Sequence, residues 1–568
     1  MRDRVEGTSG RERRVAHGGR LLIQSLAALG ARKAFGVPGE SFLAALDGFH
    51  DTAGQFDFVL CRNEGGAGFM AAAWGKLTGE PGIAFVTRGP GATNASIGVH
   101  TAMQDSVPMI LFVGQVATDM KGREAFQELD YAAVFGTMAK WAVEIDRVER
   151  IPEILARAWT TALSGRPGPV VVALPEDMLS AETDAAPLVG PIRIQEPAPD
   201  AAALAEVQAM LAGAERPAIL IGGCNWTEAG RAALQSFAEA SDIPVVAALR
   251  YQDMFDNHSP CYAGDFGLGL TEGVRRTLKE ADVVLAIGTR FGEITTEGYT
   301  LFDVPVPRQR IIHVHPSAAE IGKVYIPAIG IPAGVNAFAA ALAPVSGPWG
   351  EWRARARAAW EASFDLPAQP GPVDMGQVTA HLRDVLPEDA ILTNGAGNFT
   401  AWPNKFFKFG PKARLLGPQS GAMGYGFPAA VAARIAHPDR TVVCFAGDGD
   451  FQMNCQEMAT AVQAGAQPIV LIVNNGIYGT IRAHQEREYP ARVSGTTMVS
   501  PDFLALARAY GFHAERVEAT KDFPAAFARA LASGTGAVLD LVVAEDALSA
   551  RATITSVRNA ALARQAKS

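Results

Sequence analysis

Short apolar runs rich in Val, Ile and Phe alternate with Ala-rich stretches along nearly the whole chain, and this alternation recurs in three consecutive blocks. Strands that are apolar at almost every position are typical of parallel sheets covered by helices on both faces. A chain of 568 residues is also too long to fold around one hydrophobic core. The pattern therefore predicts an α/β fold of three consecutive domains, each with a mainly parallel sheet flanked by helices.

Changes in composition set the boundaries that we expect between the domains. Passages rich in Pro and Ala, or in Pro, Gly and Trp, are typical of linkers. The predicted organisation is a disordered tail (1–14), a first domain (15–184), a linker (185–203), a middle domain (204–345), a second linker (346–372), a third domain (373–545) and a C-terminal tail (546–568). The predicted strands are Ala34–Val37, Phe58–Cys61, Ile83–Thr87, Met109–Gly114, Val170–Leu174, Ala218–Gly222, Pro244–Ala248, Val283–Gly288, Ile311–His315, Ala390–Asn394, Thr441–Ala446, Ile469–Asn474 and Val538–Val543.

Charge and composition exclude several classes of partner. The formal net charge of −9 is spread along the chain without a basic stripe, which argues against nucleic-acid binding and favours small-molecule partners. No apolar run has the length of a membrane span, so we expect no membrane association. The cysteines form no CxxC pair and fit reduced thiols in the cytoplasm. They are Cys61, Cys224, Cys261, Cys444 and Cys455.

One motif in the third block carries most of the functional information. The predicted strand Thr441–Ala446 runs directly into Gly447-Asp448-Gly449-Asp450, and the next predicted strand ends in Asn474-Asn475. Because ligands collect at the carboxyl ends of parallel strands, these two strand ends are expected to face one another. A carboxylate, a side-chain amide and a backbone carbonyl are hard oxygen ligands that, with phosphate oxygens and water, form an octahedral Mg²⁺ site. The motif therefore predicts a metal-dependent diphosphate site, with glycines that let backbone amides approach the phosphates.

Residues 447–475 resemble the fingerprint of the thiamine diphosphate-dependent enzymes, in which Gly-Asp-Gly precedes Asn-Asn by a similar distance. The resemblance implies a pyrimidine-binding first domain, a middle domain and a diphosphate-binding third domain. It also implies that Mg²⁺ is bound by Asp448, by the side chain of Asn475 and by the backbone carbonyl of Ile477. The cofactor-binding residues implied in this way are Pro38, Asn94, Gly397, Asn398, Phe399, Gly421, Met423, Gly447, Asp448, Gly449, Asp450, Asn475, Ile477, Tyr478 and Gly479.

Glu64 is the catalytic acid that the resemblance implies. It follows the predicted strand Phe58–Cys61 and opens an Ala-rich helix, where a lone Glu otherwise compensates the helix dipole. In the family, a Glu at this place acts on a ring nitrogen of the cofactor's aminopyrimidine. Met423 matches the apolar residue that bends the cofactor, and the Gly421 carbonyl matches the acceptor of its amino group. Because the two ends of the cofactor are bound by different subunits in the family, a homodimer or homotetramer is implied.

Within this family the chain most resembles the acetohydroxyacid (acetolactate) synthases and similar carboligases, over about Val15–Ala544. Gly36–Glu40, Ala125–Glu128 and the loop around Met423 carry this resemblance. Such enzymes decarboxylate a 2-oxo acid such as pyruvate and join the remaining unit to a second carbonyl compound. Phe126 is alternatively a core residue. His484 stands where those synthases have Trp, and is alternatively an ordinary loop residue or an acid/base group. The residues expected on the substrate side are Gly36, Val37, Phe126, Gln127, Ile481 and His484.

The sequence leaves three questions open. The middle block resembles a domain that binds flavin (FAD) in those synthases, and another nucleotide or nothing in their relatives; His313–Pro316 replaces an acidic stretch there. On the same scaffold, a decarboxylase would release an aldehyde, and a lyase would cleave a hydroxyketone or diketone. Outside enzymology, the alternative is a catalytically silent cofactor-binding subunit, against which the intact Glu64, Asp448 and Asn475 argue.

Overall fold

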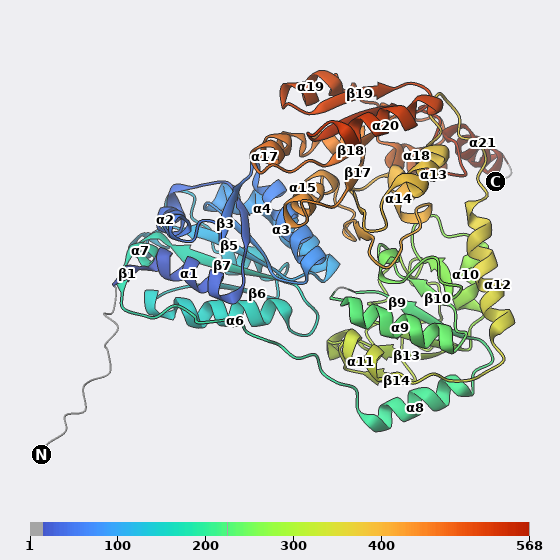
Figure 1. Ribbon diagram of the computed structural model, residues 1–568, viewed down its shortest axis with the longest axis horizontal. Coiled ribbons are helices and arrows are strands. Elements are labelled where there is room, and N and C mark those ends of the chain that lie inside the picture. Colours follow the sequence, from blue (N-terminus) through green and yellow to red (C-terminus); the bar gives the residue numbers. More distant parts are fainter. Residues whose placement is uncertain (1–14, 224, 567–568) are drawn as a thin grey trace, which may run out of the picture.

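Three six-stranded parallel sheets follow one another along the chain in the computed structural model, which describes residues 15–223 and 225–566. Figure 1 shows them as three bodies, the first in blue, the middle in green and the third in orange and red. The predicted fold class is thereby confirmed. The predicted tail 1–14 and Cys224 lie outside the described residues.

The first sheet has the strand order β3-β2-β4-β5-β7-β6, and a small antiparallel pair, β1 (Ala16–His17) and β8 (Glu182–Thr183), closes this domain. Almost every residue of the central strands is buried, because helices cover both faces of the sheet. The strands are β2 (Lys33–Gly36), β3 (Asp57–Leu60), β4 (Gly82–Val86), β5 (Met109–Gln115), β6 (Trp141–Glu144) and β7 (Pro169–Pro175). The helices are α1 (Gly18–Leu29), α2 (Leu43–Asp51), α3 (Glu64–Thr78), α4 (Gly89–Asp105), α5 (Tyr131–Phe135), α6 (Ile151–Leu163) and α7 (Glu176–Ser180).

The third sheet repeats the strand order of the first, as β16-β15-β17-β18-β20-β19, although the sequence shows no repeat. Its strands are β15 (Ile391–Asn394), β16 (Arg414–Leu416), β17 (Val442–Gly447), β18 (Ile469–Asn474), β19 (His513–Val517) and β20 (Ala537–Val542). Its helices are α13 (Met375–Val385), α14 (Ala401–Lys405), α15 (Gly426–Ala436), α16 (Asp448–Gln452), α17 (Met458–Gln463), α18 (Gly479–Glu488), α19 (Phe503–Ala509), α20 (Phe523–Ala532) and α21 (Ile554–Gln565).

The middle sheet has the different order β11-β10-β9-β12-β13-β14, with the switch in chain direction between β9 and β12. Its strands are β9 (Pro217–Ile221), β10 (Val245–Ala247), β11 (Tyr262–Asp265), β12 (Val283–Ile287), β13 (Arg310–Val314) and β14 (Ile329–Ile331). Its helices are α8 (Ala201–Ala212), α9 (Glu228–Ala240), α10 (Glu272–Lys279), α11 (Val335–Ala341) and α12 (Gly350–Glu361).

Two segments expected to be irregular contain helices. Residues 346–372, predicted as a linker, hold α12, whose Trp360 packs edge-on against Tyr262 of the middle sheet at 4.9 Å between ring centroids. Residues 546–568, predicted as a tail, hold α21, whose Arg558 pairs with the buried Glu486 of α18. In both cases tertiary contacts stabilise a helix whose polar or irregular composition did not suggest one.

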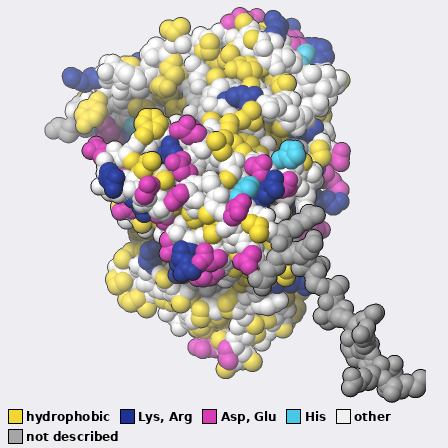
Figure 2. Space-filling model, turned by 90° about the vertical axis from the view of Figure 1, so that its left-hand side faces the viewer, with side chains coloured by type: hydrophobic (Ala, Val, Ile, Leu, Met, Phe, Trp, Pro, Cys, Tyr) yellow, Lys and Arg dark blue, Asp and Glu magenta, His cyan; other side chains and the backbone are white. Residues whose placement is uncertain are grey.

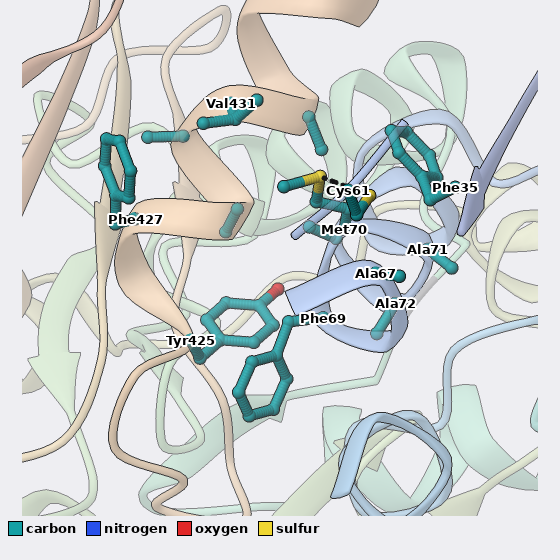
Figure 3. Packing of buried hydrophobic residues seen from close by; sticks show 14 of the residues in the cluster. Phe35, Cys61, Ala67, Phe69, Met70, Ala71, Ala72, Tyr425, Phe427 and Val431 are labelled. Carbon is teal, nitrogen blue, oxygen red and sulfur yellow. Dashed lines mark hydrogen bonds between the residues drawn. The ribbon is translucent and has the colours of Figure 1, made fainter. Parts of the chain in front are cut away.

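The first and third domains share one hydrophobic core. Helix α3 of the first domain packs against α15 of the third, and Figure 3 shows Phe69 of α3 beside Tyr425, which directly precedes α15. The rings of Phe69 and Tyr425 meet edge-on at 5.5 Å. The start of α3, which is Glu64, is therefore held by contacts from both domains.

Charges of both signs share the surface of the protein. On the face drawn in Figure 2, Lys and Arg side chains are interleaved with Asp and Glu and form no basic stripe. Among residues 15–223 and 225–566, no helix is both long and apolar enough to cross a membrane.

Candidate functional site

A cavity of about 250 Å³ lies at the carboxyl ends of β15, β17 and β18 in the third domain. This is the edge at which an open parallel sheet binds its ligands. Its described lining residues all lie between Gln369 and Ser549, so it is formed without any residue of the first domain. The predicted site residues that line it are Gly397, Asn398, Phe399, Gly421, Met423, Gly447, Asp448, Gly449, Asp450, Asn475, Ile477, Tyr478, Gly479 and Ile481.

Asp448 joins the two halves of the predicted metal motif. Its Oδ2 accepts the backbone N–H of Gly476, between Asn475 and Ile477, at 2.8 Å, and its Oδ1 accepts that of Gly449 at 3.0 Å. The side chain is 2% exposed, and burial raises the pKa of this carboxyl above its ordinary value. A buried carboxylate that receives only backbone and hydroxyl donors gains from a nearby cation. The described residues contain no cluster of three or more His, Cys, Asp or Glu suited to a metal, so a cation here would need other oxygen ligands as well, such as amide, carbonyl, phosphate or water oxygens.

Asp450 holds three of the cavity loops together. Its Oδ1 accepts the backbone N–H of Gly424 at 2.8 Å and that of Ala396 at 3.2 Å. It is almost completely buried, and this burial raises the pKa of Asp450 to about 7. A carboxyl group tied to two backbone amides in this way fixes the relative position of the Gly395–Asn398 and Gly421–Gly424 loops.

Two glycines that line the cavity, Gly397 and Gly447, lie where a side chain would not fit. A Cβ at Gly447 would lie 2.9 Å from the Phe399 ring, and Gly397 has a positive φ of 155°, so neither position accepts a side chain without strain. Thr480 of α18 donates to Asn398 Oδ1 at 3.0 Å. Backbone amides and the start of α18 are thereby presented to the cavity, an arrangement suited to phosphate oxygens.

Glu64 begins α3 and lies in the first domain, outside the cavity of its own chain. The side chain of Asn63 caps the helix by accepting the N–H of Gly65 at 2.8 Å. The side-chain amide of Asn94, on α4, donates to Glu64 Oε2 at 3.0 Å. Two residues implied independently by the resemblance, Glu64 and Asn94, are therefore in direct contact.

The other predicted residues of the first domain also lie at the carboxyl ends of its strands. Gly36 ends β2, Val37 and Pro38 follow it, and the N–H of Gly89 at the start of α4 donates to Gln127 O at 2.9 Å. Phe126 is 72% exposed, which rules out the alternative of core packing within this chain. These residues lie together at one edge of the first sheet and do not line the cavity of the third domain.

His484 is exposed on α18, one turn beyond Ile481, and its Nδ1 is 3.1 Å from an Arg487 guanidinium nitrogen. It does not line the cavity, although Ile481 does. Several lining residues were not predicted. Most lie in the predicted second linker or C-terminal tail or carry apolar side chains, and Thr480 is a polar residue between the predicted Gly479 and Ile481. The lining residues that were not predicted are Gln369, Val373, Met375, Ala396, Trp402, Val473, Thr480, Val543, Ala547, Leu548 and Ser549.

Where the strands of the middle domain switch direction, a cavity of about 310 Å³ is lined by Gly223 and the Asn225–Thr227 segment after β9, whereas the side chains after β12 and β13 are buried. Thr289, Phe291, His313 and His315 follow or end β12 and β13, and each is at most 3% exposed. His313 Nε2 lies 2.9 Å from Thr289 O, and the Phe291 ring stands edge-on to His313 at 5.0 Å. Nearby, Arg166 and Glu320 form an ion pair at 3.1 Å. The polar side chains after β12 and β13 therefore make contacts with neighbouring protein groups.

Comparison with known proteins agrees with this architecture. Residues 16–134 match the thiamine pyrophosphate enzyme N-terminal TPP binding domain, residues 204–342 the central domain, and residues 395–541 the C-terminal TPP binding domain. The chain therefore belongs to the thiamine pyrophosphate enzymes, and within them it is an acetolactate synthase-like enzyme.

Named relatives support that narrower grouping. The acetolactate synthase isozyme 2 large subunit of Escherichia coli is 31% identical over 505 residues, which cover 88% of this chain and 91% of that protein. The probable acetolactate synthase large subunit of Methanocaldococcus jannaschii is 32% identical over 546 residues, covering 93% and 92% respectively. The acetolactate synthase large subunit of Corynebacterium glutamicum is 32% identical over 554 residues, covering 93% and 87%.

Proposed function

We propose that this enzyme is a Mg²⁺-dependent carboligase that decarboxylates a 2-oxo acid such as pyruvate and joins the remaining unit to a second carbonyl compound. The observation that carries the proposal is the convergence of Asp448 and the Asn475–Ile477 turn in the cavity of the third domain. The names of the acetolactate synthase relatives agree with it. Thiamine diphosphate, when bound, supplies the carbanion and the electron sink that this chemistry needs.

The chain's own residues have separate tasks at the two ends of the cofactor. Asp448, the Asn475 side chain and the Ile477 carbonyl would hold Mg²⁺, because the ion prefers hard oxygen ligands and completes its shell with phosphate oxygens and water. Met423 would support the cofactor between its two rings, and the Gly421 carbonyl would accept a hydrogen bond from its amino group. Glu64, oriented by Asn94, exchanges a proton with the pyrimidine ring nitrogen.

A second copy of the chain completes the site in this proposal. The cavity of the third domain is lined by residues between Gln369 and Ser549, whereas Glu64 and the exposed Phe126 lie on the first domain. If Glu64 and Asp448 act on one cofactor, they come from different subunits of a dimer or of a larger symmetric assembly. Phe126 and Gln127 then face the partner's cavity on its substrate side.

Subunit mixing tests this arrangement directly. Glu64→Gln and Asp448→Ala homodimers are each expected to be inactive. In a mixed dimer, the intact Glu64 of one chain meets the intact Asp448 of the other, so one of the two sites is complete. Random reassociation should therefore restore roughly a quarter of wild-type activity, because half of the dimers are mixed and each has one good site. No recovery after verified exchange would place both residues of a site in one chain.

Product analysis tests the reaction. Pyruvate with Mg²⁺ and thiamine diphosphate, with and without an added aldehyde or second 2-oxo acid, is expected to give a coupled hydroxyketone or hydroxy-oxo acid. Free aldehyde as the sole product would establish a decarboxylase instead. His484→Phe is expected to change the choice of acceptor; unaltered turnover with every acceptor would remove His484 from the substrate side.

We further propose that the enzyme works without flavin. The support is the burial of Thr289, His313 and His315 after β12 and β13 and the Arg166–Glu320 ion pair nearby. The cavity of about 310 Å³ after β9 is the place where a nucleotide would otherwise bind. The purified protein is expected to lack the visible absorbance of a flavin and to keep its activity when flavin is omitted. Stoichiometric FAD in the purified protein would contradict this.

A further inference from the structure

A fully buried carboxylate of the third domain holds the turn that presents Glu64. Glu457 follows α16 and precedes α17, and its side chain is 0% exposed. Its Oε1 accepts the backbone N–H of Asn63 at 2.9 Å and that of Arg62 at 3.1 Å, and its Oε2 also lies 3.2 Å from Arg62 N. These two amides immediately precede Glu64, so a side chain from the diphosphate-binding half fixes the backbone at the pyrimidine-binding half.

The surrounding residues are arranged to receive this carboxylate. Thr460 donates its hydroxyl to Glu457 Oε2 at 2.5 Å and approaches Leu60 O at 3.1 Å. A Cβ on Gly66 would lie 2.6 Å from Glu457 Oε1, so Gly66 leaves the space that the carboxylate enters. The N-terminus of α3 adds a favourable dipole for a negative charge at this point.

Three contacts together define where Glu64 lies. Glu457 fixes the backbone before it, Asn63 caps the helix that it begins, and Asn94 orients its carboxyl group. Apolar packing between α3 and α15 already holds the two domains together. Burying a carboxylate is unfavourable unless it is well hydrogen-bonded, so Glu457 is not needed merely to join the domains.

We infer that Glu457 is a positioning residue for Glu64: it holds the Arg62–Asn63 turn so that the Glu64 carboxyl group meets the pyrimidine ring of the cofactor bound by the partner. The inference rests on the proposed function. It also links Glu457 to both sites of a dimer. Glu457 holds the turn before Glu64, which acts at the partner's cofactor, and it lies in the same segment as Asp448, which binds the cofactor of its own subunit.

The test compares Glu457→Gln with a matched control. The amide variant keeps the size of the side chain but turns an N–H₂ group or a weaker acceptor toward the Arg62 and Asn63 amides. The control is Asp282→Asn in the middle domain, because Asp282 likewise accepts two consecutive backbone amides, those of Glu215 and Arg216, each at 2.8 Å. Amide hydrogen exchange in the cofactor-free protein, thermal stability, cofactor affinity, KM and kcat are measured for both.

For Glu457→Gln, exchange at Arg62 and Asn63 is expected to rise about tenfold or more, and kcat to fall by a similar factor, because hydrogen bonds to a charged acceptor are lost. KM and thiamine diphosphate affinity are expected to stay within about twofold, because the diphosphate end is untouched. The near-ultraviolet circular dichroism of the bound cofactor should change as it does in Glu64→Gln. Asp282→Asn is expected to speed exchange only at Glu215 and Arg216 and to leave kcat as it is.

Several outcomes would overturn the inference. One is unchanged kcat despite faster exchange at Arg62 and Asn63; another is unchanged exchange at these amides. A loss of activity explained entirely by a lower folded fraction would show a structural role alone. If Glu457→Gln does not fold, Thr460→Val, which removes one donor to the carboxylate, is expected to give a smaller effect in the same direction. A wild-type protein that binds no thiamine diphosphate would instead refute the proposed function, and the exchange data would still report on the contact.

Discussion

The side-chain amide of Asn94 donates to Glu64 Oε2 at 3.0 Å and so connects the first turn of α3 with the second turn of α4. The two helices begin at the carboxyl ends of β3 and β4, the strands on either side of β2. The contact orients the carboxyl group that the proposed mechanism uses, and it can be removed without touching that group.

Asn94→Ala is expected to lower kcat about tenfold, because an amide-to-carboxylate hydrogen bond that orients a catalytic group is lost. The affinity for thiamine diphosphate should change much less, since the diphosphate is held by the other domain. Steady-state kinetics and cofactor titration measure the two quantities. Ser96→Ala, on the same helix and bonded only to Thr93 O among the described contacts, is the control; equal losses in both variants would contradict the assignment.

Removal of the metal tests the other end of the site. Chelation is expected to release thiamine diphosphate and abolish activity, and added Mg²⁺ should restore both, because Asp448 and a diphosphate would otherwise face each other as uncompensated negative charges. Asp448→Asn should weaken cofactor binding even with excess Mg²⁺. Calorimetric titration with and without chelator measures the effect. Full cofactor affinity in the chelated protein would show that no metal bridges it.

The sequence was sufficient for the interiors of the six-stranded sheets and for the motif residues that line the cavity, but not for most sheet edges. In the six-stranded sheets it did not predict β6, β11, β14, β16 and β19, each of which lies at an edge; among edge strands it predicted β3. The short pair β1 and β8 was not predicted either. An edge strand has one neighbour and often a solvated face, so it lacks the continuous apolar run that marks a central strand. In β6 all four residues are only half-buried, and in β19 three of the five residues are half-buried or exposed.

Contacts between segments that are distant in the sequence likewise could not be predicted from local sequence patterns. Glu457 lies within the motif stretch that identified the site, yet its contact with the Arg62–Asn63 turn depends on how the first and third domains pack. The cavity walls formed by Gln369 and by residues 547–549 depend on the fold of segments with linker-like or tail-like composition. Motif spacing located the chemistry, whereas the residues that position it required the tertiary structure.

Removing the charge of one partner of a buried ion pair at the junction of the domains is expected to lower the free energy of unfolding. Lys76 Nζ lies 3.0 Å from Asp105 Oδ2 and 2.8 Å from Gly417 O, and the two charged side chains are 4% and 2% exposed. Lys76→Met leaves the Asp105 carboxylate buried beside an apolar group, which costs about 3–5 kcal/mol. The midpoint of urea unfolding should fall accordingly. The exposed pair Lys412–Glu388 is the control, and Lys412→Met should change stability by less than about 1 kcal/mol.

Stability is expected to rise with pH across the acidic range because of His315. This imidazole is 3% exposed, and burial lowers its pKa from the ordinary 6.5 to about 4. Between these two values the unfolded chain binds a proton that the folded chain does not, so unfolding is favoured as the pH falls, and folding stability is recovered above about pH 6.5. The contribution reaches at most about 3 kcal/mol.

His315→Asn isolates this contribution. The Asn Oδ1 can take the place of the imidazole Nδ1, which accepts the backbone N–H of Ser317 at 3.0 Å, but it does not titrate. The difference in urea midpoint between pH 5 and pH 8 is therefore expected to be smaller in the variant than in the wild type, although carboxylates titrate in both. The exposed His50→Asn serves as the matched control and should retain the wild-type difference. A variant at position 315 with the same pH dependence as the wild type would show that His315 does not carry it.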